Sequence, residues 1–377
     1  MANAGDGIGI TERVGKSTIS QWMTMVTNAL ERHYPMLARL RKLNRIKRVT
    51  NEGGGEMRWV VKKLLHDLET ASIGIAIPFS PLDNLLNATL PWREYIVKDA
   101  IYAQEMAENG GKAGLIKLFT RKADSMRDSA KERLAAEFYI DGNATGNSRR
   151  WHGIESMMSI STQTATDIRA TIPNDTYAGL STAYTSFKAS ATAGQPEYGA
   201  WSPVIISTNY TDGSGSAVSF ASVGDDLIRA MQRRGRYGGS DKMDLIVLSG
   251  PDWEALATIL DDKERAVLKP GELESREYGF DLSQALKLNG SYIIYDDALP
   301  TTDANSDTVR GYGYNTERME LRVLNSGMEN ATAGEDSLFE FWDMFNINTR
   351  SQNLLLSHYG NLRYESPKFF GKLVDAA

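Results

Sequence analysis

Apolar residues at helical spacing predict one long amphipathic helix, from Lys112 to Tyr139. The break Asn109-Gly110-Gly111 precedes this helix, and Asp141-Gly142 ends it. Its apolar positions recur every three or four residues and form a single stripe: Leu115, Phe119, Ala123, Met126, Ala130, Leu134 and Phe138. At 1.5 Å per residue, such a helix is about 40 Å long. The stripe needs a partner, and we expect the last strands of the chain to supply it.

Alternating apolar and charged residues predict two strands upstream of this helix, joined by a long irregular connection. The first is a half-buried strand with three apolar positions: Met57, Trp59 and Val61. The second covers residues 89–101 and places three apolar side chains on one face: Leu90, Trp92 and Ile96. Pro91 puts this second strand at a sheet edge. The connection is apolar from Ile73 to Leu85, and we expect this arm tip to lie on a neighbouring subunit.

The first fifty residues combine a polar start, an amphipathic segment and a basic cluster. Residues 1–18 predict a mobile arm, and an amphipathic helix is expected from Thr18. Pro35 interrupts that helix, and apolar residues then restart a helical turn: Met36, Leu37 and Leu40. The basic cluster follows: Arg39, Arg41, Lys42, Arg45, Lys47 and Arg48. It is either a contact with nucleic acid or an acidic neighbour, or a solvated helix face; the sequence leaves both interpretations open.

Beyond the long helix, the pattern predicts a mixed α/β block and then mostly strands. Residues 142–222 are rich in Ser, Thr, Gly, Asn and Ala, which favours short strands and long loops. Helices and buried strands then alternate. The first helix runs from Val223 to Arg236 with Leu227, Ile228 and Met231 inward, and a second helix opens at Pro251 with Trp253, Leu256, Ile259 and Leu260 buried. The buried strands are Leu245 to Leu248 and Ser291 to Tyr295. A charged loop is expected over 261–277. Three terminal strands are expected near Met319 to Val323, Phe339 to Ile347 and Leu354 to Tyr364.

Composition narrows the classes of protein that this pattern can belong to. The 377 residues are 41% hydrophobic and carry a net charge of −6, which suits a folded core and argues against wrapping nucleic acid along the whole chain. The absence of cysteine excludes disulfide scaffolds, thiolate metal sites and cysteine nucleophiles. We expect neither a membrane span nor a signal peptide, because no apolar run is long enough.

No motif in the chain has the context that its chemistry requires. Gly15-Lys16-Ser17-Thr18 matches the end of a phosphate-binding loop, but Ile10 stands where the first glycine belongs. A calcium-loop match that starts at Asp141 has His152 in place of the final glutamate. Paired carboxylates are expected in caps or solvated loops: Asp225–Asp226, Asp261–Asp262 and Asp296–Asp297. His33 and His152 are expected in surface or capping roles. We therefore expect no catalytic, cofactor-binding or metal-binding residues.

Several short stretches, taken in order, point to one family. They are Phe138-Tyr139-Ile140-Asp141-Gly142 followed by Gly153-Ile154, Asp175-Thr176-Tyr177-Ala178-Gly179-Leu180, Asp244-Leu245-Ile246-Val247-Leu248-Ser249 before the helix at Pro251, Tyr314-Asn315-Thr316 before Met319, and Tyr359-Gly360-Asn361-Leu362. With this element order, residues 45–373 resemble tailed-bacteriophage major capsid proteins of the HK97-like fold. The resemblance implies an α+β fold whose function is self-assembly into an icosahedral shell around a double-stranded DNA genome.

The resemblance also divides the chain into parts. Residues 1–50 would form the N-terminal arm, and 51–100 the extended E-loop hairpin that reaches over a neighbouring subunit. Residues 101–150 would form the peripheral domain with its long spine helix, and 151–335 the mixed α/β axial domain around the five-fold and six-fold axes. The terminal strands, 336–377, would return to the peripheral domain.

The implied partners are other copies of the chain, as pentamers and hexamers, with packaged DNA in non-specific contact. A portal and a decoration protein are further possible partners, and no membrane is expected. The chain would be assembled in the host bacterial cytoplasm and would reside in the virion. Some members carry a long helical scaffolding segment before the hairpin. This chain has no room for one, so a separate or cleaved scaffolding protein is expected. Some members also form a Lys–Asn cross-link; Lys62 and Lys63 lie near the arm, but no acceptor can be identified.

Three alternatives remain open from the sequence. An encapsulin-type compartment shares the fold and would enclose an enzyme cargo instead of a genome. A soluble α+β enzyme would need a concave pocket lined by titratable groups with shifted pKa values. A nucleic-acid-binding protein that uses residues 39–48 would bind DNA in a salt-sensitive way.

Overall fold

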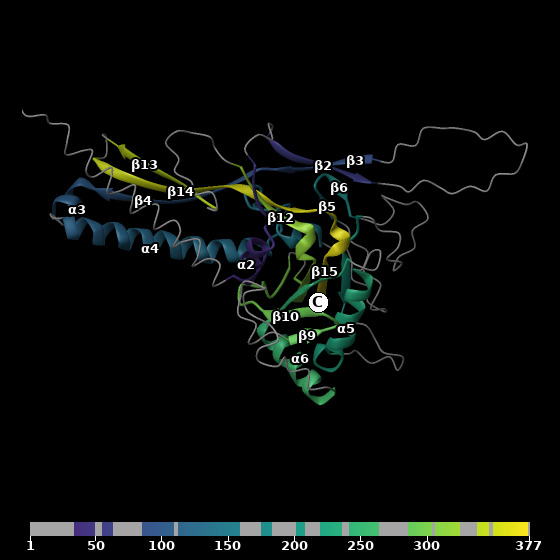
Figure 1. Ribbon diagram of the computed structural model, residues 1–377. Helices are drawn as coiled ribbons and strands as arrows, with labels where there is room; N and C mark the ends of the chain where they lie inside the picture. Colours follow the sequence, from purple (N-terminus) through teal and green to yellow (C-terminus); the bar gives the residue numbers. More distant parts are fainter. Residues whose placement is uncertain are drawn as a thin grey trace, which may run out of the picture.

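The computed structural model describes residues 34–49, 55–62, 85–108, 112–158, 175–182, 201–207, 219–235, 241–263, 286–303, 306–324, 338–346 and 350–375. These residues form two sheets, a long helix along one of them, and a separate two-stranded hairpin (Figure 1). The long helix and the first sheet extend to one side of the molecule. The hairpin extends to the opposite side, and the second sheet with two helices lies below the point where they meet (Figure 1).

The first sheet is built around one strand of 14 residues, β14 (Ser351–Tyr364). One edge of β14 pairs with β4 (Arg93–Tyr102), and the other pairs with β13 (Glu340–Asn346) and then β12 (Met319–Leu324). The short strand β1 (Ile46–Val49) pairs with β12 in parallel. Side chains alternate along β14, so that Leu354, Leu356, Leu362 and Tyr364 are buried on one face. The other face looks away from this core.

The predicted long helix is α4 (Lys112–Glu137), which runs beneath β4 and β14 (Figure 1). The four later members of its stripe that we can describe are buried: Met126, Ala130, Leu134 and Phe138. Ala123 packs against the same cluster, whereas the side chains of Leu115 and Phe119 lie outside the description. The strand in contact with α4 is β4, which was not the expected partner; the terminal strand β14 pairs with β4, and its Leu354 and Leu356 belong to the same core cluster as the stripe. A short helix, α3 (Ala103–Glu108), precedes α4 and was not expected from the sequence.

The hairpin consists of β2 (Glu56–Lys62) and β3 (Leu85–Pro91), in antiparallel register. Met57, Ala88 and Leu90 are buried, which confirms the expected half-buried strand and the edge position of Pro91. One expectation was wrong. Ile96 is 50% exposed and does not share a face with Leu90, because the chain leaves β3 at Trp92 and starts the separate strand β4. The arm tip from Ile73 lies outside the described residues up to position 84.

The second sheet has six strands, in the order β7-β15-β11-β8-β10-β9. Their bounds are Val204–Ser207 for β7, Gly371–Asp375 for β15, Thr308–Tyr314 for β11, Leu245–Leu248 for β8, Ser291–Tyr295 for β10 and Leu286–Leu288 for β9. From the sequence, we expected the terminal strands to return to the long helix. That is wrong for β15, which pairs with β7 and β11.

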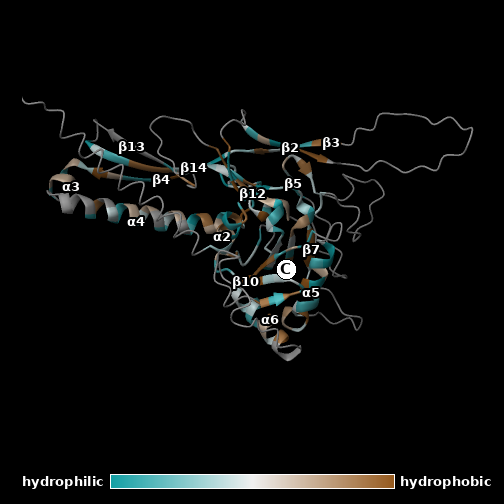
Figure 2. Ribbon diagram, viewed as in Figure 1, coloured by the Kyte–Doolittle hydropathy of each residue, from teal (hydrophilic) through white to brown (hydrophobic). Residues whose placement is uncertain are grey.

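Two helices cover one face of this sheet: α5 (Phe220–Arg234) and α6 (Gly250–Lys263). Leu227, Ile228 and Met231 of α5 are fully buried, as their spacing predicted. The helix α6 begins beside Pro251 and continues to Lys263, so the start of the expected 261–277 loop is helical. The rest of that loop is outside the described residues. Figure 2 shows brown, hydrophobic residues on α5 and α6 and on the strands beside them, interspersed with teal, hydrophilic ones.

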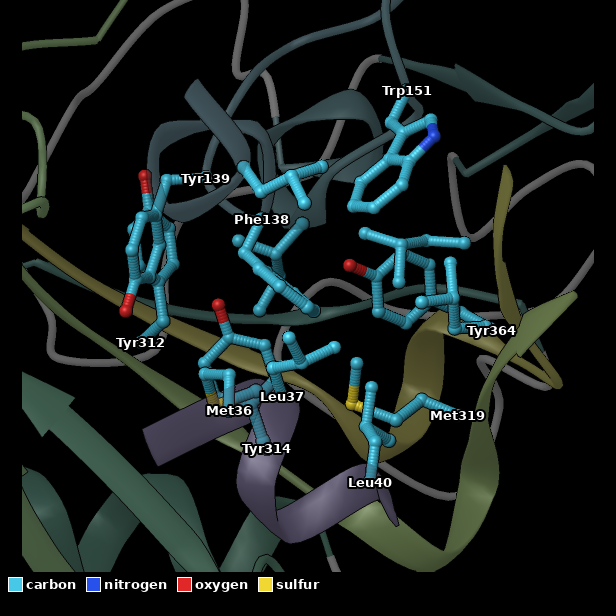
Figure 3. Packing of buried hydrophobic residues seen from close by; sticks show 14 of the residues in the cluster. Met36, Leu37, Leu40, Phe138, Tyr139, Trp151, Tyr312, Tyr314, Met319 and Tyr364 are labelled. Atoms are coloured by element: carbon cyan, nitrogen blue, oxygen red, sulfur yellow. The ribbon is translucent and has the colours of Figure 1, made fainter. Parts of the chain in front are cut away.

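Short elements connect the two sheets. They are the helix α2 (Pro35–Lys42) and the 3-10 helices η1 (Ile154–Met157), η4 (Thr316–Arg318) and η5 (Pro367–Phe369). A tight turn between the strands β5 (Thr176–Tyr177) and β6 (Leu180–Ser181) also lies there. The expected turn after Pro35 is α2, and its Met36, Leu37 and Leu40 are buried. In Figure 3 these residues lie below Phe138 and near Tyr314, in one cluster that joins the long helix to both sheets. The helix expected from Thr18 lies outside the described residues.

Candidate functional site

The end of the long helix is fastened to the strand that returns from the hairpin. Glu137 is fully buried, and its carboxylate accepts hydrogen bonds from Tyr95 Oη at 2.5 Å and Arg150 Nε at 2.8 Å. The backbone N–H of Trp151 donates to Tyr95 Oη at 2.6 Å. Burial and the Glu137 charge raise the pKa of Tyr95, so the phenol stays protonated and keeps donating. The start of β4, which follows the hairpin, and the end of the long helix therefore meet at one buried carboxylate, that of Glu137.

Two glycines permit this turn to lie against the helix end. A Cβ on Gly153 would lie 2.6 Å from the carbonyl oxygens of Glu137 and Ile140, and a Cβ on Gly142 would lie 2.5 Å from that of Trp151. No side chain fits at such distances from backbone atoms. The N–H of Ile154 uses the close approach to donate to the carbonyl of Phe138 at 2.9 Å. This contact explains the two glycines of the first sequence motif, Gly142 and Gly153.

Asn361 connects the same junction to the hairpin. Its side-chain oxygen accepts from the N–H groups of His152 at 2.9 Å and Leu362 at 2.8 Å. Its Nδ2 donates to the carbonyl of Pro91, the last residue of β3, at 2.8 Å. The last sequence motif thus supplies one side chain that ties β14, the helix exit and the hairpin together.

The motif from Asp175 to Leu180 supports the hairpin from a second direction. It forms the β5–β6 turn, with Ala178 and Gly179 in the left-handed region at φ of 52° and 77°. The carbonyl of Ala178 accepts a hydrogen bond from Thr89 N in β3 at 3.0 Å. Tyr177 is fully buried, and its Oη accepts from the N–H of Tyr364 at 2.9 Å.

Two histidines are buried in this junction, so the expected surface or capping role of His152 was wrong. His152 is 4% exposed and His358 is 1% exposed. Burial lowers the pKa of each to about 4; the Arg93 charge adds to this at His152, and that of Arg48 at His358. Both rings are therefore neutral at pH 7. His33 lies outside the described residues.

We expect these histidines to make the fold acid-sensitive. Their pKa is lower in the folded state than the ordinary 6.5, so their contribution is complete above pH 6.5 and is lost as the pH falls toward 4. Titration of the histidine ring resonances by NMR should show two groups that stay neutral at pH 5.5. Protonation of both rings near pH 6.5 without loss of structure would contradict the prediction.

A buried ion cluster connects the helix exit to the last strand of the second sheet. Lys372 of β15 has no exposed side-chain surface, and its Nζ lies 2.5 Å from Glu155 Oε1 and 2.7 Å from Asp303 Oδ2. Tyr312 Oη donates to the other Glu155 oxygen at 2.6 Å. Burial alone would lower the pKa of Lys372, but the two carboxylates outweigh it and raise this pKa. No motif or periodicity singled out any of these residues in advance.

Part of the N-terminal basic cluster pairs with carboxylates of its own chain. Arg39 is 8% exposed and donates to Asp244 Oδ2 at 3.1 Å and to Thr316 Oγ1 at 3.2 Å. Asp244 also accepts from the N–H of Thr316 at 2.6 Å. For Arg39, both interpretations of the basic cluster were wrong: it is neither a solvated face nor a contact with another molecule.

Glu320 on β12 is surrounded by four cationic side chains. They are Lys47 at 2.8 Å, Arg363 at 2.9 Å, Arg322 at 3.2 Å and Arg45 at 3.5 Å. Burial would raise the pKa of Glu320, but the hydrogen bond from Lys47 and the surrounding positive charges lower it to about 2. Arg363 also stacks over the Trp59 ring of the hairpin, 5.0 Å from its centroid.

Glu320→Gln is expected to lower the free energy of unfolding by about 3 kcal/mol at pH 7. The folded pKa is depressed, so this contribution is present above pH 4.5 and disappears as the pH falls toward 2. Chemical unfolding of both proteins at pH 7 and pH 3 should therefore show a difference that shrinks in acid. An equal difference at both pH values would contradict the assignment.

The other candidate residues from the sequence do not come together as a catalytic or metal-binding site within the described residues. Asp225 is buried in the middle of α5, 3.9 Å from Arg229, so its expected place in a cap or solvated loop was wrong. Asp296 accepts from Tyr139 Oη at 2.6 Å and so holds the core. Asp141 accepts from Asn143 N in a turn. In the described ranges, no three His, Asp or Glu residues gather as metal ligands, and no helix is long and apolar enough to cross a membrane. The phosphate-loop match at Gly15 lies outside them.

Among the described residues, the exposed large apolar side chains lie on the hairpin and the first sheet, apart from Tyr295 of β10 in the second sheet. Val60 and Leu85 of the hairpin are 61% and 54% exposed. Ile96, Tyr102 and Tyr359 are exposed on the face of β4 and β14 that looks away from α4. Apolar surface in these places is typical of a chain that contacts a partner.

The fold matches solved capsid structures over almost its whole length. The capsid asymmetric unit of cyanophage A-1(L) is 14% identical, with a TM-score of 0.58 over 91% of this chain and 94% of the other. The capsid of a native GTA particle is 12% identical, with a TM-score of 0.52 over 90% of each chain. No protein-family model and no curated protein sequence matches the chain. The chain has the HK97-like fold of tailed-phage capsid structures.

Proposed function

We propose that this chain is the major capsid protein of a tailed bacteriophage and assembles into the icosahedral shell that encloses a double-stranded DNA genome. The observation that carries the proposal is the end-to-end match to two capsid folds, with nine tenths of each chain covered. The exposed apolar residues of the hairpin and first sheet are consistent with subunit contacts.

The elements of the structure have distinct roles in this proposal. The hairpin of β2 and β3 continues into residues 63–84, whose apolar tip would lie on a neighbouring subunit. The first sheet and α4 are the peripheral domain, and the second sheet with α5 and α6 is the axial domain around the five-fold and six-fold axes. Many weak contacts, repeated by symmetry, would then close pentamers and hexamers into a shell.

The proposed function also implies further partners and a location for this protein. A separate scaffolding protein and a portal would act during assembly, a decoration protein could bind the shell, and packaged DNA would contact the interior without sequence specificity. The chain would assemble in the host bacterial cytoplasm and reside in the virion. Its role is structural, and no catalytic step is assigned to any residue.

The experiment that tests this function is the mass and shape of the purified protein, measured by light scattering and negative-stain electron microscopy. Closed icosahedral particles, or pentamers and hexamers that close when conditions change, are the expected result. Nucleic acid inside particles isolated from the source distinguishes a phage shell from an encapsulin with enzyme cargo. A monomer or dimer that never assembles, even with a candidate scaffolding protein, would disprove the proposal.

A further inference from the structure

A lysine amine and an aspartate carboxylate are in direct contact in the interior of the protein. Lys372 Nζ of β15 lies 2.7 Å from Asp303 Oδ2, although the two residues are 69 positions apart in the chain. The side chain of Lys372 has no exposed surface, and that of Asp303 is 1% exposed. The folded chain therefore holds an amine against a carboxyl group at an effective concentration that free reactants do not reach.

The two oxygens of the Asp303 carboxylate have different surroundings. Oδ1 accepts a hydrogen bond from the N–H of Asp307 at 3.0 Å, and the N–H of Asp303 donates to the carbonyl of Asp307 at 3.0 Å. Oδ2 faces the Lys372 amine. A backbone N–H on one oxygen stabilises the negative charge that develops there when a nucleophile attacks the carboxyl carbon. The other oxygen, beside the amine, is the one placed to leave as water.

Glu155 lies beside the same amine and can carry its proton. Glu155 Oε1 is 2.5 Å from Lys372 Nζ, and Oε2 accepts a hydrogen bond from Tyr312 Oη at 2.6 Å. Lys372 stands opposite Tyr312 in the β11–β15 ladder, so both side chains reach one carboxylate. Burial raises the pKa of Glu155, which favours the transfer of a proton to it. The three groups thus match a nucleophile, an acceptor carboxyl and a general base.

The interior favours a neutral product over the ion pair. A buried ammonium and a buried carboxylate each carry a desolvation cost that their mutual attraction offsets only in part. Condensation converts both into one uncharged amide and releases one water molecule. Tyr139 stacks on Tyr312 with ring centroids 5.8 Å apart and covers this side of the cluster with apolar surface (Figure 3). Exclusion of water also protects the amide from hydrolysis.

We propose that Lys372 and Asp303 condense into an isopeptide bond within the folded chain, with Glu155 as the general base. Glu155 takes one proton from the Lys372 ammonium, and the neutral amine attacks Cγ of Asp303. The Cγ–Oδ2 bond then breaks. Oδ2 leaves as water with the proton that Glu155 returns and a second proton from the nitrogen. The amide keeps the third proton on Nζ and Oδ1 as its carbonyl oxygen, and Glu155 ends as the carboxylate that it was.

This bond fastens the last strand of the second sheet to the turn before β11. The strand β15 lies between β7 and β11 and is close to the end of the chain, so it is the strand that can be peeled away from one end. The chain has no cysteine with which to form a disulfide. An amide that closes a loop of 69 residues restricts the unfolded chain in the same way, without any redox chemistry. The inference goes beyond the proposed function and does not rest on it.

The test is the intact mass of the full-length protein, measured by mass spectrometry after denaturation. We expect most molecules to be lighter than the sequence by one water molecule. Tryptic digestion should give a branched peptide that joins Lys372 to Asp303, with no cleavage after Lys372. Full mass together with cleavage after Lys372 would disprove the inference. The mass can be measured on unassembled subunits, so this result and the formation of shells are independent of each other.

Two variants assign the loss of water to these residues. Lys372→Arg keeps the positive charge but has no nucleophilic amine, so it should have its full mass. If Lys372→Arg also lacks one water molecule, the loss arises elsewhere in the chain and the inference is wrong. Glu155→Gln should form the bond at least about a hundredfold more slowly, followed by intact mass at successive times after synthesis is stopped. An unchanged rate in folded Glu155→Gln, checked by circular dichroism, would overturn the role given to Glu155.

Discussion

Gly153→Ala is expected to prevent the accumulation of folded protein. The added Cβ would lie 2.6 Å from two carbonyl oxygens and 2.7 Å from a backbone nitrogen, at the last residue of α4 and in the turn that follows it. These atoms cannot rotate away as a side chain can, so the helix end and the turn must separate. That separation also breaks the hydrogen bond from Ile154 N to Phe138 O and exposes the buried Glu137. We expect a loss above about 3 kcal/mol, a large part of the stability of an ordinary domain.

Soluble yield and the denaturant midpoint of any recovered protein measure this effect. Gly250→Ala is the matched control, because its Cβ would meet nothing within 4 Å at the start of α6. Alanine also favours a helix relative to glycine, so this control should be neutral or slightly stabilising. Equal yields and equal midpoints for both variants would show that the turn does not depend on the close approach.

Lys372→Met is expected to cost about 3–5 kcal/mol at pH 7, the penalty for leaving buried charge unpaired. Methionine fills nearly the same volume, so little of the effect comes from packing. Without the ammonium group, Glu155 and Asp303 face each other inside the protein, and the buried pair can only be relieved by taking up a proton. Burial already raises the pKa of Glu155 in the folded protein, and loss of the Lys372 charge, which lowers it, should raise this pKa further. The variant should therefore lose stability as the pH rises and recover part of it near pH 5.

The control for Lys372→Met is a variant that removes every charge of the cluster. Lys372→Met combined with Glu155→Gln and Asp303→Asn keeps the shapes and leaves no unpaired ion. It should be more stable at pH 7 than Lys372→Met alone, and its stability should depend less on pH. Unfolding curves of the three proteins at pH 5 and pH 7 measure this. If Lys372→Met is equally stable at both pH values, buried charge is not what destabilises it.

Elements with a clear periodicity were predictable from the sequence. Leu245–Leu248 and Ser291–Tyr295 are strands with the expected bounds, because short runs of apolar residues between polar breaks are typical of buried strands. The long helix was equally clear, although it ends at Glu137, two residues before the predicted end. In each case the pattern depends on neighbours in the sequence. The order of apolar and polar residues within the segment was therefore sufficient to identify the helix or strand.

Features that depend on contacts between distant segments were not predictable. Nothing near Lys372 in the sequence indicates that Glu155 and Asp303 will meet its ammonium group. Glu137 did carry a signal: it stands three residues after Leu134 of the apolar stripe, where a buried carboxylate needs partners. The exposure of Ile96 was missed because we predicted one continuous strand over residues 89–101. The structure has two strands there, separated at Trp92, so the alternation of buried and exposed side chains does not continue from the first strand into the second. The destination of β15 depends on the sheet topology, which periodicity does not encode.

The position of β15 has a consequence for the order of synthesis and assembly. In the second sheet this strand lies between β7 and β11, both of which the ribosome makes earlier. The first sheet likewise depends on β14 for its ladders with β4, β12 and β13. A nascent chain that has not yet reached residue 364 therefore lacks part of β14 of the first sheet, and one that has not yet reached residue 375 lacks part of β15 of the second. Under the proposed function, subunits that are still being translated would lack two finished sheets and could not yet assemble through surfaces that these sheets form.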